Sequence, residues 1–245
     1  MVKGVAIGSL IVIAVLGCGR NPTLAPIVGE SGSNKTSHKS AVKNQNIHTV
    51  KRGETLYSIA FKYGQDYRAV AKRNDVATPY TIYPGQELYL TDEANKIAAN
   101  SSQTPRKKKS KTAGEDNKEK LPTQSVRRWV WPAGGKVLTS YSASGRKGID
   151  ISGRLGEPVK AAADGKVVYS GGGLIGYGEL IIIKHNKNYL SAYGHNDKLL
   201  VKQGDFVGGG QKIATMGRTG TDKVKLHFEI RRDGKPVDPI RYLPK

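Results

Sequence analysis

The run Leu180-Ile181-Ile182-Ile183-Lys184 decides how the C-terminal half of this chain folds. Its three consecutive isoleucines predict a strand that is buried on both faces. Comparable runs rich in Val, Ile and Tyr lie at 166–169, 189–193 and 226–230, and glycine-bearing turns separate them. No long amphipathic helix interrupts this series. We therefore predict an antiparallel, all-β domain over residues 129–245.

Residues 47–91 have a different pattern, which predicts a small α+β unit. His48 to Lys51 favour a strand, and Glu87 to Leu90 favour a second one after a Pro84-Gly85 turn. Two short helices are expected between them. The first helix ends at Gly64 and has its apolar positions at Leu56, Ile59, Ala60 and Tyr63. The second helix is capped by Asp66 and ends near Asn74, and its inner face consists of Tyr67, Val70 and Ala71. The predicted order is β-α-α-β.

This small unit resembles a LysM domain. The resemblance rests on Val50-Lys51-Arg52-Gly53-Glu54-Thr55-Leu56-Tyr57-Ser58-Ile59-Ala60, on Asn74, and on Ile82-Tyr83-Pro84-Gly85-Gln86-Glu87-Leu88. It implies that the unit binds peptidoglycan glycan strands in a shallow groove. The implied glycan-binding residues are Gly53, Thr55, Leu56, Thr81, Ile82 and Tyr83. The helical spacing gives Leu56 a competing role in the core.

The N-terminus predicts export. Lys3 precedes the apolar run 5–16, which at about 1.5 Å per helical residue is too short for a bilayer core of about 30 Å. Residues 1–17 are therefore interpreted as a signal peptide. Val15-Leu16-Gly17-Cys18 resembles a bacterial lipobox, which implies that Cys18, the only cysteine, is lipidated. Gly19 after that cysteine favours the outer membrane, with the protein facing the periplasm.

Two polar stretches are expected to be linkers. Residues 18–46 are rich in Ser, Asn, Lys, Gly and Pro and predict a flexible tether. Residues 92–128 form a basic linker that contains Arg106-Lys107-Lys108-Lys109-Ser110-Lys111. The net charge of +20 is spread along the whole chain, which favours an anionic environment over sequence-specific DNA reading. We expect no nucleic-acid partner, because the chain is exported and lacks a platform of stacking aromatics.

The C-terminal domain resembles the LytM/lysostaphin-type zinc endopeptidases. The matching segments are Gly148-Ile149-Asp150, Tyr177-Gly178, Tyr193-Gly194-His195 and Leu226-His227-Phe228-Glu229. In active members, zinc is held by a His four residues before the Asp, by that Asp, and by the second His of an HxH pair. The resemblance therefore leaves Asp150 and His227 as remnant metal positions and His195 as a remnant catalytic position.

Two departures from that pattern predict an inactive, metal-free site with no cofactor. Arg146 stands four residues before Asp150, and Lys225 replaces the first His of the HxH pair. An arginine side chain is always charged and has no acceptor lone pair, so it cannot bind zinc. Asp150 and His227 remain either as fold elements only or as parts of a partner-binding groove. In the second reading, Arg146 and Lys225 supply the charge of the missing metal and pair with Asp150, and the groove comprises Arg146, Asp150, His195, Lys225 and His227.

A lipobox, a LysM unit and a degenerate LytM domain in one chain resemble the NlpD-type lipoproteins. This resemblance implies a lipid-anchored, peptidoglycan-binding protein that activates cell-wall N-acetylmuramoyl-L-alanine amidases during septal splitting and daughter-cell separation. Two alternatives stay open: an active zinc metalloendopeptidase that cleaves peptidoglycan cross-links, and a purely structural anchor between the outer membrane and the cell wall.

Overall fold

The computed structural model describes residues 47–92 and 126–245, both of which belong to one compact unit, His38–Lys245. The predicted signal peptide, Cys18, the tether at 18–46 and most of the linker at 92–128 lie outside the described residues. No helix among the described residues is long and apolar enough to cross a membrane.

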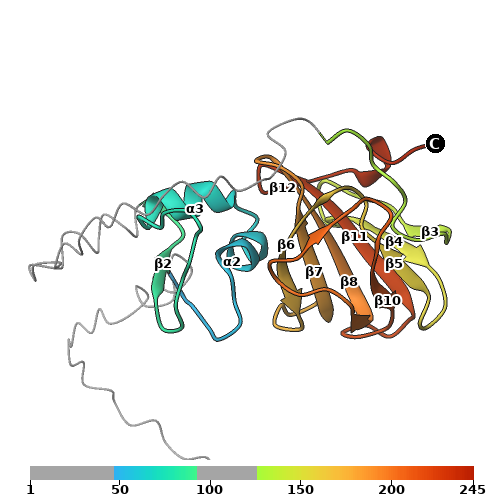
Figure 1. The fold of residues 1–245 in the computed structure, drawn as a ribbon, viewed down its shortest axis with the longest axis horizontal. Coiled ribbons are helices and arrows are strands. Elements are labelled where there is room, and N and C mark those ends of the chain that lie inside the picture. The colour runs from blue at the N-terminus through green and yellow to red at the C-terminus, as the bar shows by residue number, and fades with distance from the viewer. Residues whose placement is uncertain (1–46, 93–125) are drawn as a thin grey trace, which may run out of the picture. The chain divides into compact units, whose positions relative to one another are not determined.

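Residues 47–92 form the predicted β-α-α-β unit (Figure 1). In chain order its elements are β1 (Ile47–Thr49), α2 (Leu56–Lys62), α3 (Tyr67–Arg73) and β2 (Glu87–Tyr89). Strands β1 and β2 pair in antiparallel fashion. Thr55 and Ser58 form a reciprocal capping box at the start of α2, and Asp66 caps α3 by accepting from the backbone N–H of Arg68. The local capping chemistry of the sequence therefore places both helices.

The sequence prediction extended the buried face of α2 one position too far. Tyr63 is the C-cap rather than a helical residue, and 38% of its surface is exposed. The helix stops there because Gly64 follows with a φ of +62°, a conformation in which glycine ends helices.

Residues 126–245 form the predicted antiparallel β domain (Figure 1). Its elements are β3 (Val137–Thr139), β4 (Ile149–Ser152), β5 (Pro158–Lys160), β6 (Gly165–Gly171), β7 (Glu179–Lys184), β8 (Tyr189–Leu199), β9 (Phe206–Val207), β10 (Lys212–Met216), β11 (Lys225–Arg232), β12 (Lys235–Val237) and a short 3₁₀ turn η1 (Pro239–Arg241). The sheet runs β3-β4-β11-β8-β7-β6-β9; β12 also pairs with β11, and β10 joins β8 to β5.

The core of this domain lies on one face of the sheet. Alternate residues of β11, Leu226, Phe228 and Ile230, are fully buried in it. Ile181, Ile182 and Ile183 of β7 are also completely buried, as their run predicted. Because side chains alternate along a strand, the positions of β11 between its core residues face the other side of the sheet. Those positions carry the candidate site.

Candidate functional site

Strands β4 and β11 bring the two remnant metal positions together. They pair in antiparallel fashion with His227 opposite Asp150. Lys225 lies two residues before His227 on the same strand and therefore projects from the same face. The strand register alone places these three side chains within reach of one another.

Asp150 is the centre of a compact polar network. Its Oδ2 atom lies 2.9 Å from the Lys225 Nζ atom and accepts a second hydrogen bond of 2.9 Å from the Thr139 hydroxyl. Its Oδ1 atom lies 2.8 Å from His227 Nδ1. The Asp150 side chain is 15% exposed, so both ion pairs are largely shielded from water.

The network continues along the same face of β11. His227 Nε2 lies 3.2 Å from the Glu229 carboxylate, whose other oxygen accepts 2.8 Å hydrogen bonds from the Arg231 guanidinium. The Tyr177 hydroxyl donates to Glu229 at 2.8 Å. Glu229 is fully buried and Arg231 is 1% exposed. The two charges are buried as a pair, because burying either one without its partner would be unfavourable in free energy.

The network keeps His227 positively charged. Burial disfavours the imidazolium, but the hydrogen bonds to Asp150 and Glu229 outweigh it and raise the pKa of His227 to about 9. Only the imidazolium donates from both ring nitrogens, so a carboxylate on each side stabilises this form. Burial raises the pKa of Asp150, and the hydrogen bonds from His227, Lys225 and Thr139 more than reverse this, leaving that pKa well below its ordinary value. The site therefore holds two cations around one carboxylate.

His195 lies beside this network but takes no direct part in it. Its backbone has a φ of +65°, and its ring Nδ1 lies 2.8 Å from the Thr219 carbonyl. The ring centroids of His195 and His227 are 6.0 Å apart. Burial lowers the pKa of His195, and the charge on His227 lowers it further. A neutral and a charged imidazole therefore stand side by side.

Arg146 does not occupy the position that the sequence hypothesis gave it. It is exposed on the loop between β3 and β4, and its Nε donates to the Ser140 carbonyl at 2.9 Å. Lys225 is the cation from that hypothesis that pairs with Asp150. The reason is geometric: Lys225 is held in a strand, whereas Arg146 lies on a loop whose path the spacing to Asp150 does not determine.

Sequence reasoning gave no role to Thr139, Tyr177, Glu229 or Arg231. A signal for two of them was present, because His227, Glu229 and Arg231 alternate with the apolar residues Leu226, Phe228 and Ile230 at the period of a strand. Thr139 is brought to Asp150 by the β3–β4 pairing, which shifts register between Val137 and Thr139. Such an irregularity leaves no recognisable mark in the sequence.

The residues of the implied glycan groove differ in exposure, and Ile82 is half-buried. Gly53, Thr81 and Tyr83 are exposed, and Tyr83 keeps 68% of its surface accessible. Thr55 and Leu56 are buried, since Thr55 caps α2 and Leu56 is in the core. Of the exposed residues, Thr81 and Tyr83 precede β2, and Gly53 lies between β1 and α2.

The side chains present do not fit a catalytic zinc ion. Within residues 47–92 and 126–245, no group of three or more His, Cys, Asp or Glu is arranged to hold a metal. Catalytic zinc sites use three protein ligands. Here the Lys225 ammonium and the His227 imidazolium both bind the carboxylate that would serve as a ligand. No step through a metal is derived for this site.

The comparisons with known proteins agree with both motif resemblances. Residues 144–239 match the model of peptidase family M23, and residues 48–91 match that of the LysM domain. The lipoprotein NlpD/LppB homolog of Pseudomonas aeruginosa is 42% identical over 275 residues, covering 98% of this chain and 91% of that protein. The chain belongs to the NlpD/LppB lipoprotein family.

Two further proteins are similar to parts of this chain. The murein hydrolase activator NlpD of Escherichia coli is 40% identical over 256 residues, covering 81% of this NlpD/LppB-family chain and 68% of that protein. Among solved structures, the antimicrobial peptidase lysostaphin from Staphylococcus simulans matches with a TM-score of 0.43 and 29% identity, covering 46% of this chain and 51% of that one.

Proposed function

We propose that this protein binds peptidoglycan through its LysM domain and activates cell-wall N-acetylmuramoyl-L-alanine amidases through its M23-fold domain, without cleaving peptidoglycan itself. The observation that carries the proposal is the Lys225–Asp150–His227 network, in which Lys225 binds one of the two remnant metal positions, Asp150, and His227 is the other. Relatives named murein hydrolase activators, at 39–40% identity, support the same reading.

The charge of the network favours a binding role over hydrolysis. An ammonium group has three donors, and one of them is directed at Asp150. Lys225 and His227 keep 22% and 19% of their side chains exposed, so an incoming carboxylate or carbonyl can reach them from outside. We assign the partner groove to Asp150, His195, Lys225 and His227, with Arg146 at its exposed rim.

The exposed turn of the LysM domain supplies the proposed glycan contacts. Gly53, Thr81, Ile82 and Tyr83 are the residues we expect to touch the sugar. Tyr83 offers an exposed aromatic ring, on which the apolar face of a sugar can pack. Thr55 and Leu56 act by holding α2 and the turn in place rather than by direct contact.

The proposed location is the outer membrane, with a lipid on Cys18 as the anchor. Relatives named lipoproteins, among them an outer membrane antigenic lipoprotein of Haemophilus influenzae, support this assignment. Replacing Cys18 with Ala is expected to release the protein from the membrane fraction. The variant should still sediment with purified peptidoglycan through residues 47–91. Unchanged fractionation with the outer membrane would show that Cys18 is not the anchor.

Dye release from labelled peptidoglycan tests the proposed activity. The full chain is assayed alone and together with each candidate amidase. We expect no release by the chain alone and a large increase when it is added to its amidase. Release by the chain alone would contradict the proposal.

Single substitutions in the same assay locate the groove. Lys225→Ala is expected to reduce stimulation about tenfold or more, because it removes a partly buried charge from the contact. Arg146→Ala should have a smaller effect, since that side chain is solvated. Lys212→Ala, at an exposed position on β10, is the matched control and should stimulate like wild type. If Lys225→Ala and Lys212→Ala stimulate equally, the network is not the interface.

A further inference from the structure

The second face of the β-sheet is covered by another part of the same chain. On β7, Ile181 and Ile183 face the domain core, whereas Leu180 and Ile182 face the opposite side. Leu180 and Ile182 are nevertheless fully buried, in one cluster with Leu56, Ile59 and Phe61 of the LysM domain. An apolar sheet face of this kind requires a cover, and here α2 supplies it.

Two cations on this face are buried by the same contact. Lys184 is 4% exposed, and its Nζ donates to the Tyr57 hydroxyl at 3.1 Å and lies over the rings of Tyr57 and Tyr67 at 5.4 and 5.2 Å. The Arg231 guanidinium carbon lies 3.3 Å from the centroid of the Phe61 ring. Arg231 also donates to the Phe61 backbone carbonyl. Buried cations require partners, and the LysM domain provides several of them.

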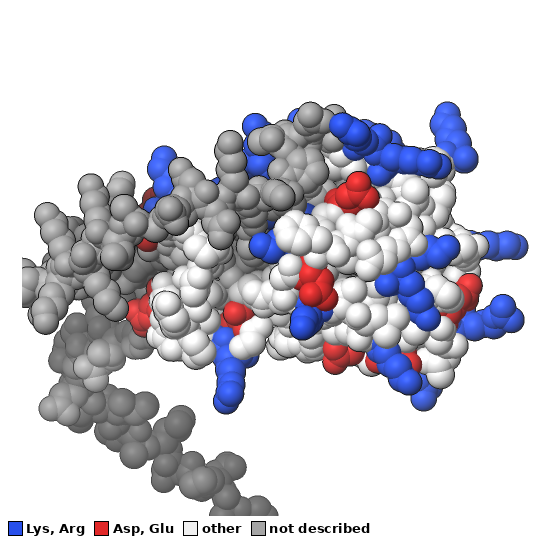
Figure 2. Space-filling model, in the orientation of Figure 1, with Lys and Arg blue, Asp and Glu red and all other residues white. Residues whose placement is uncertain are grey.

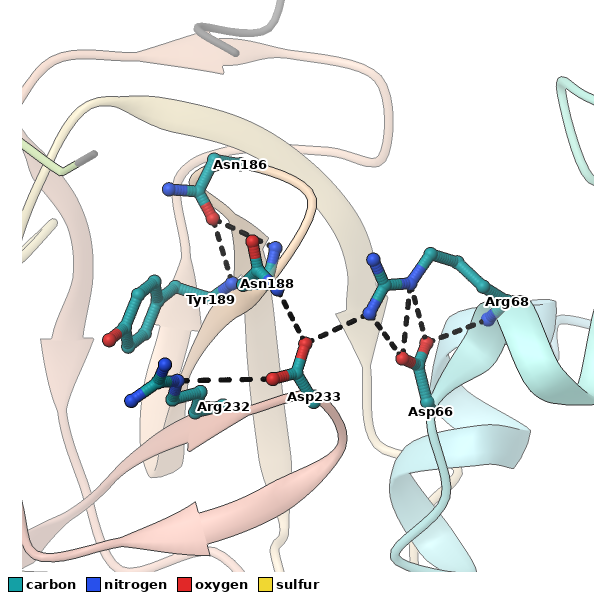
Figure 3. Close-up of polar contacts among 7 residues, drawn as sticks. All are labelled: Asp66, Arg68, Asn186, Asn188, Tyr189, Arg232 and Asp233. Atoms are coloured by element: carbon teal, nitrogen blue, oxygen red, sulfur yellow. Dashed lines mark hydrogen bonds and ion pairs between the residues drawn. The ribbon is translucent and has the colours of Figure 1, made fainter. Parts of the chain in front are cut away.

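The rim of the contact is polar and closely fitted (Figure 3). Arg68 on α3 forms a 2.9 Å ion pair with Asp233, which also accepts from the Asn188 amide at 2.7 Å. A Cβ atom added to Gly234 would lie 2.3 Å from the backbone of Gln65. The turn between β11 and β12 therefore approaches the LysM domain too closely for a side chain at that position.

We propose that this sheet face is a docking surface whose partner is the chain's own LysM domain, and that docking positions the remnant site through Arg231. The docking surface comprises Leu180, Ile182, Lys184, Leu190, Ala192 and Arg231. Its apolar part matches α2, and its two cations meet the aromatic rings and the carbonyl of the LysM domain. This inference does not depend on amidase activation.

The contact reaches the remnant site through consecutive hydrogen bonds. Arg231 is held on one side by Phe61 and on the other by Glu229, and Glu229 in turn lies against His227. On the LysM side, the Tyr80 ring packs edge-on against Tyr57 and Tyr67, beside the turn that we assign to glycan. A movement of the LysM domain therefore changes the surroundings of Glu229 and His227.

Amide hydrogen exchange of the full chain in detergent tests the docking. Lys184→Glu places a carboxylate against two aromatic faces and the Tyr57 hydroxyl, so we expect exchange in the α2 peptide 56–62 to accelerate on the order of tenfold. Lys212→Glu makes the same charge change at an exposed position on β10 and should leave α2 unchanged. Equal protection of α2 in all three proteins would overturn the proposal.

A charge exchange at the rim separates docking from misfolding. Asp233→Arg and Arg68→Asp should each accelerate exchange in α2 and α3, because each places like charges near one another. The double variant restores an opposite pair and should recover part of the protection. No recovery, with both single variants folded, would show that the Arg68–Asp233 contact does not hold the domains together.

The side-chain ¹⁵N resonances of His227 test the link to the remnant site. In Lys184→Glu they should shift relative to wild type, because undocking removes Phe61 from Arg231 and loosens Glu229. In Lys212→Glu they should stay in place. Undocking by hydrogen exchange with unshifted His227 resonances would disprove the positioning role of Arg231.

Discussion

The two residues that depart from the zinc-binding pattern lie in different surroundings. Lys225 lies in strand β11 and is held by Asp150 in a largely buried network, whereas Arg146 lies exposed on a loop and contacts a backbone carbonyl. Both replace a histidine of the pattern with a cation. A substitution within a strand is carried by the sheet register into the site, whereas a loop can direct the new side chain to solvent.

The Lys and Arg side chains divide in the same way into exposed and shielded groups. Lys and Arg side chains are spread over the visible surface, with Asp and Glu between them (Figure 2), and the chain carries a net charge of +20. Most of the Lys and Arg side chains of residues 47–92 and 126–245 are exposed and contribute little to stability singly. Lys225, Lys184 and Arg231 differ because they are shielded from water. We therefore expect the removal of any one of them to lower stability.

The largest expected effect is the loss of the carboxylate between the two cations. Asp150→Asn leaves Lys225 without its counter-charge and His227 with Glu229 alone, which should lower the free energy of unfolding by about 4 kcal/mol. Asp222→Asn, on an exposed loop, is the control and should change it by less than about 0.5 kcal/mol. Urea unfolding measures both. A fully stable Asp150→Asn protein would show that the network does not contribute to folding.

A pH profile of stability isolates His227. Its folded pKa of about 9 lies above the ordinary value of 6.5, so its contribution is fully present below pH 6.5 and is lost as the pH rises to about 9. The shift corresponds to on the order of 3 kcal/mol. His227→Gln should remove this part of the profile. His195 does not interfere, because its pKa is lowered and its titration lies below this window. Parallel profiles of the two proteins between pH 6.5 and 9 would contradict a charged His227.

The smallest effects on stability are expected from a direct comparison of the two substituted positions. Lys225→Met should cost about 1–3 kcal/mol, since it leaves a largely buried carboxylate with one donor fewer. Arg146→Met should stay within about 0.5 kcal/mol, as is usual for a solvated position. Thermal unfolding at one pH is sufficient for this comparison. Similar losses at both positions would mean that the loop is more constrained than its exposure indicates.

The sequence predicted most of the fold, because the deciding signals were local. Thr55 and Asp66 are good N-caps and begin the two helices of the LysM domain. The run Ile181–Ile183 predicted a doubly buried strand, and the i, i+2 spacing predicted that Lys225 and His227 share a face. These inferences need only residue type and strand or helix period.

The features that escaped prediction depend on contacts between distant segments. Arg146 could not be placed because a loop has no period, and Thr139 reaches Asp150 only through a register shift. The burial of Lys184 and Arg231 was not predicted either. Both are buried, because the LysM domain covers them. The isoleucine run predicted that the second face of β7 is buried, but spacing within one segment does not identify the segment that covers it.

Zinc content tests the central claim that an internal ion network replaces the metal. The full chain is incubated with zinc, freed of unbound metal and measured by elemental analysis beside Asp150→Ala and His227→Ala. We expect no stoichiometric zinc in the wild-type protein and no difference from the two alanine variants. One zinc per wild-type chain, lost in both alanine variants, would contradict it.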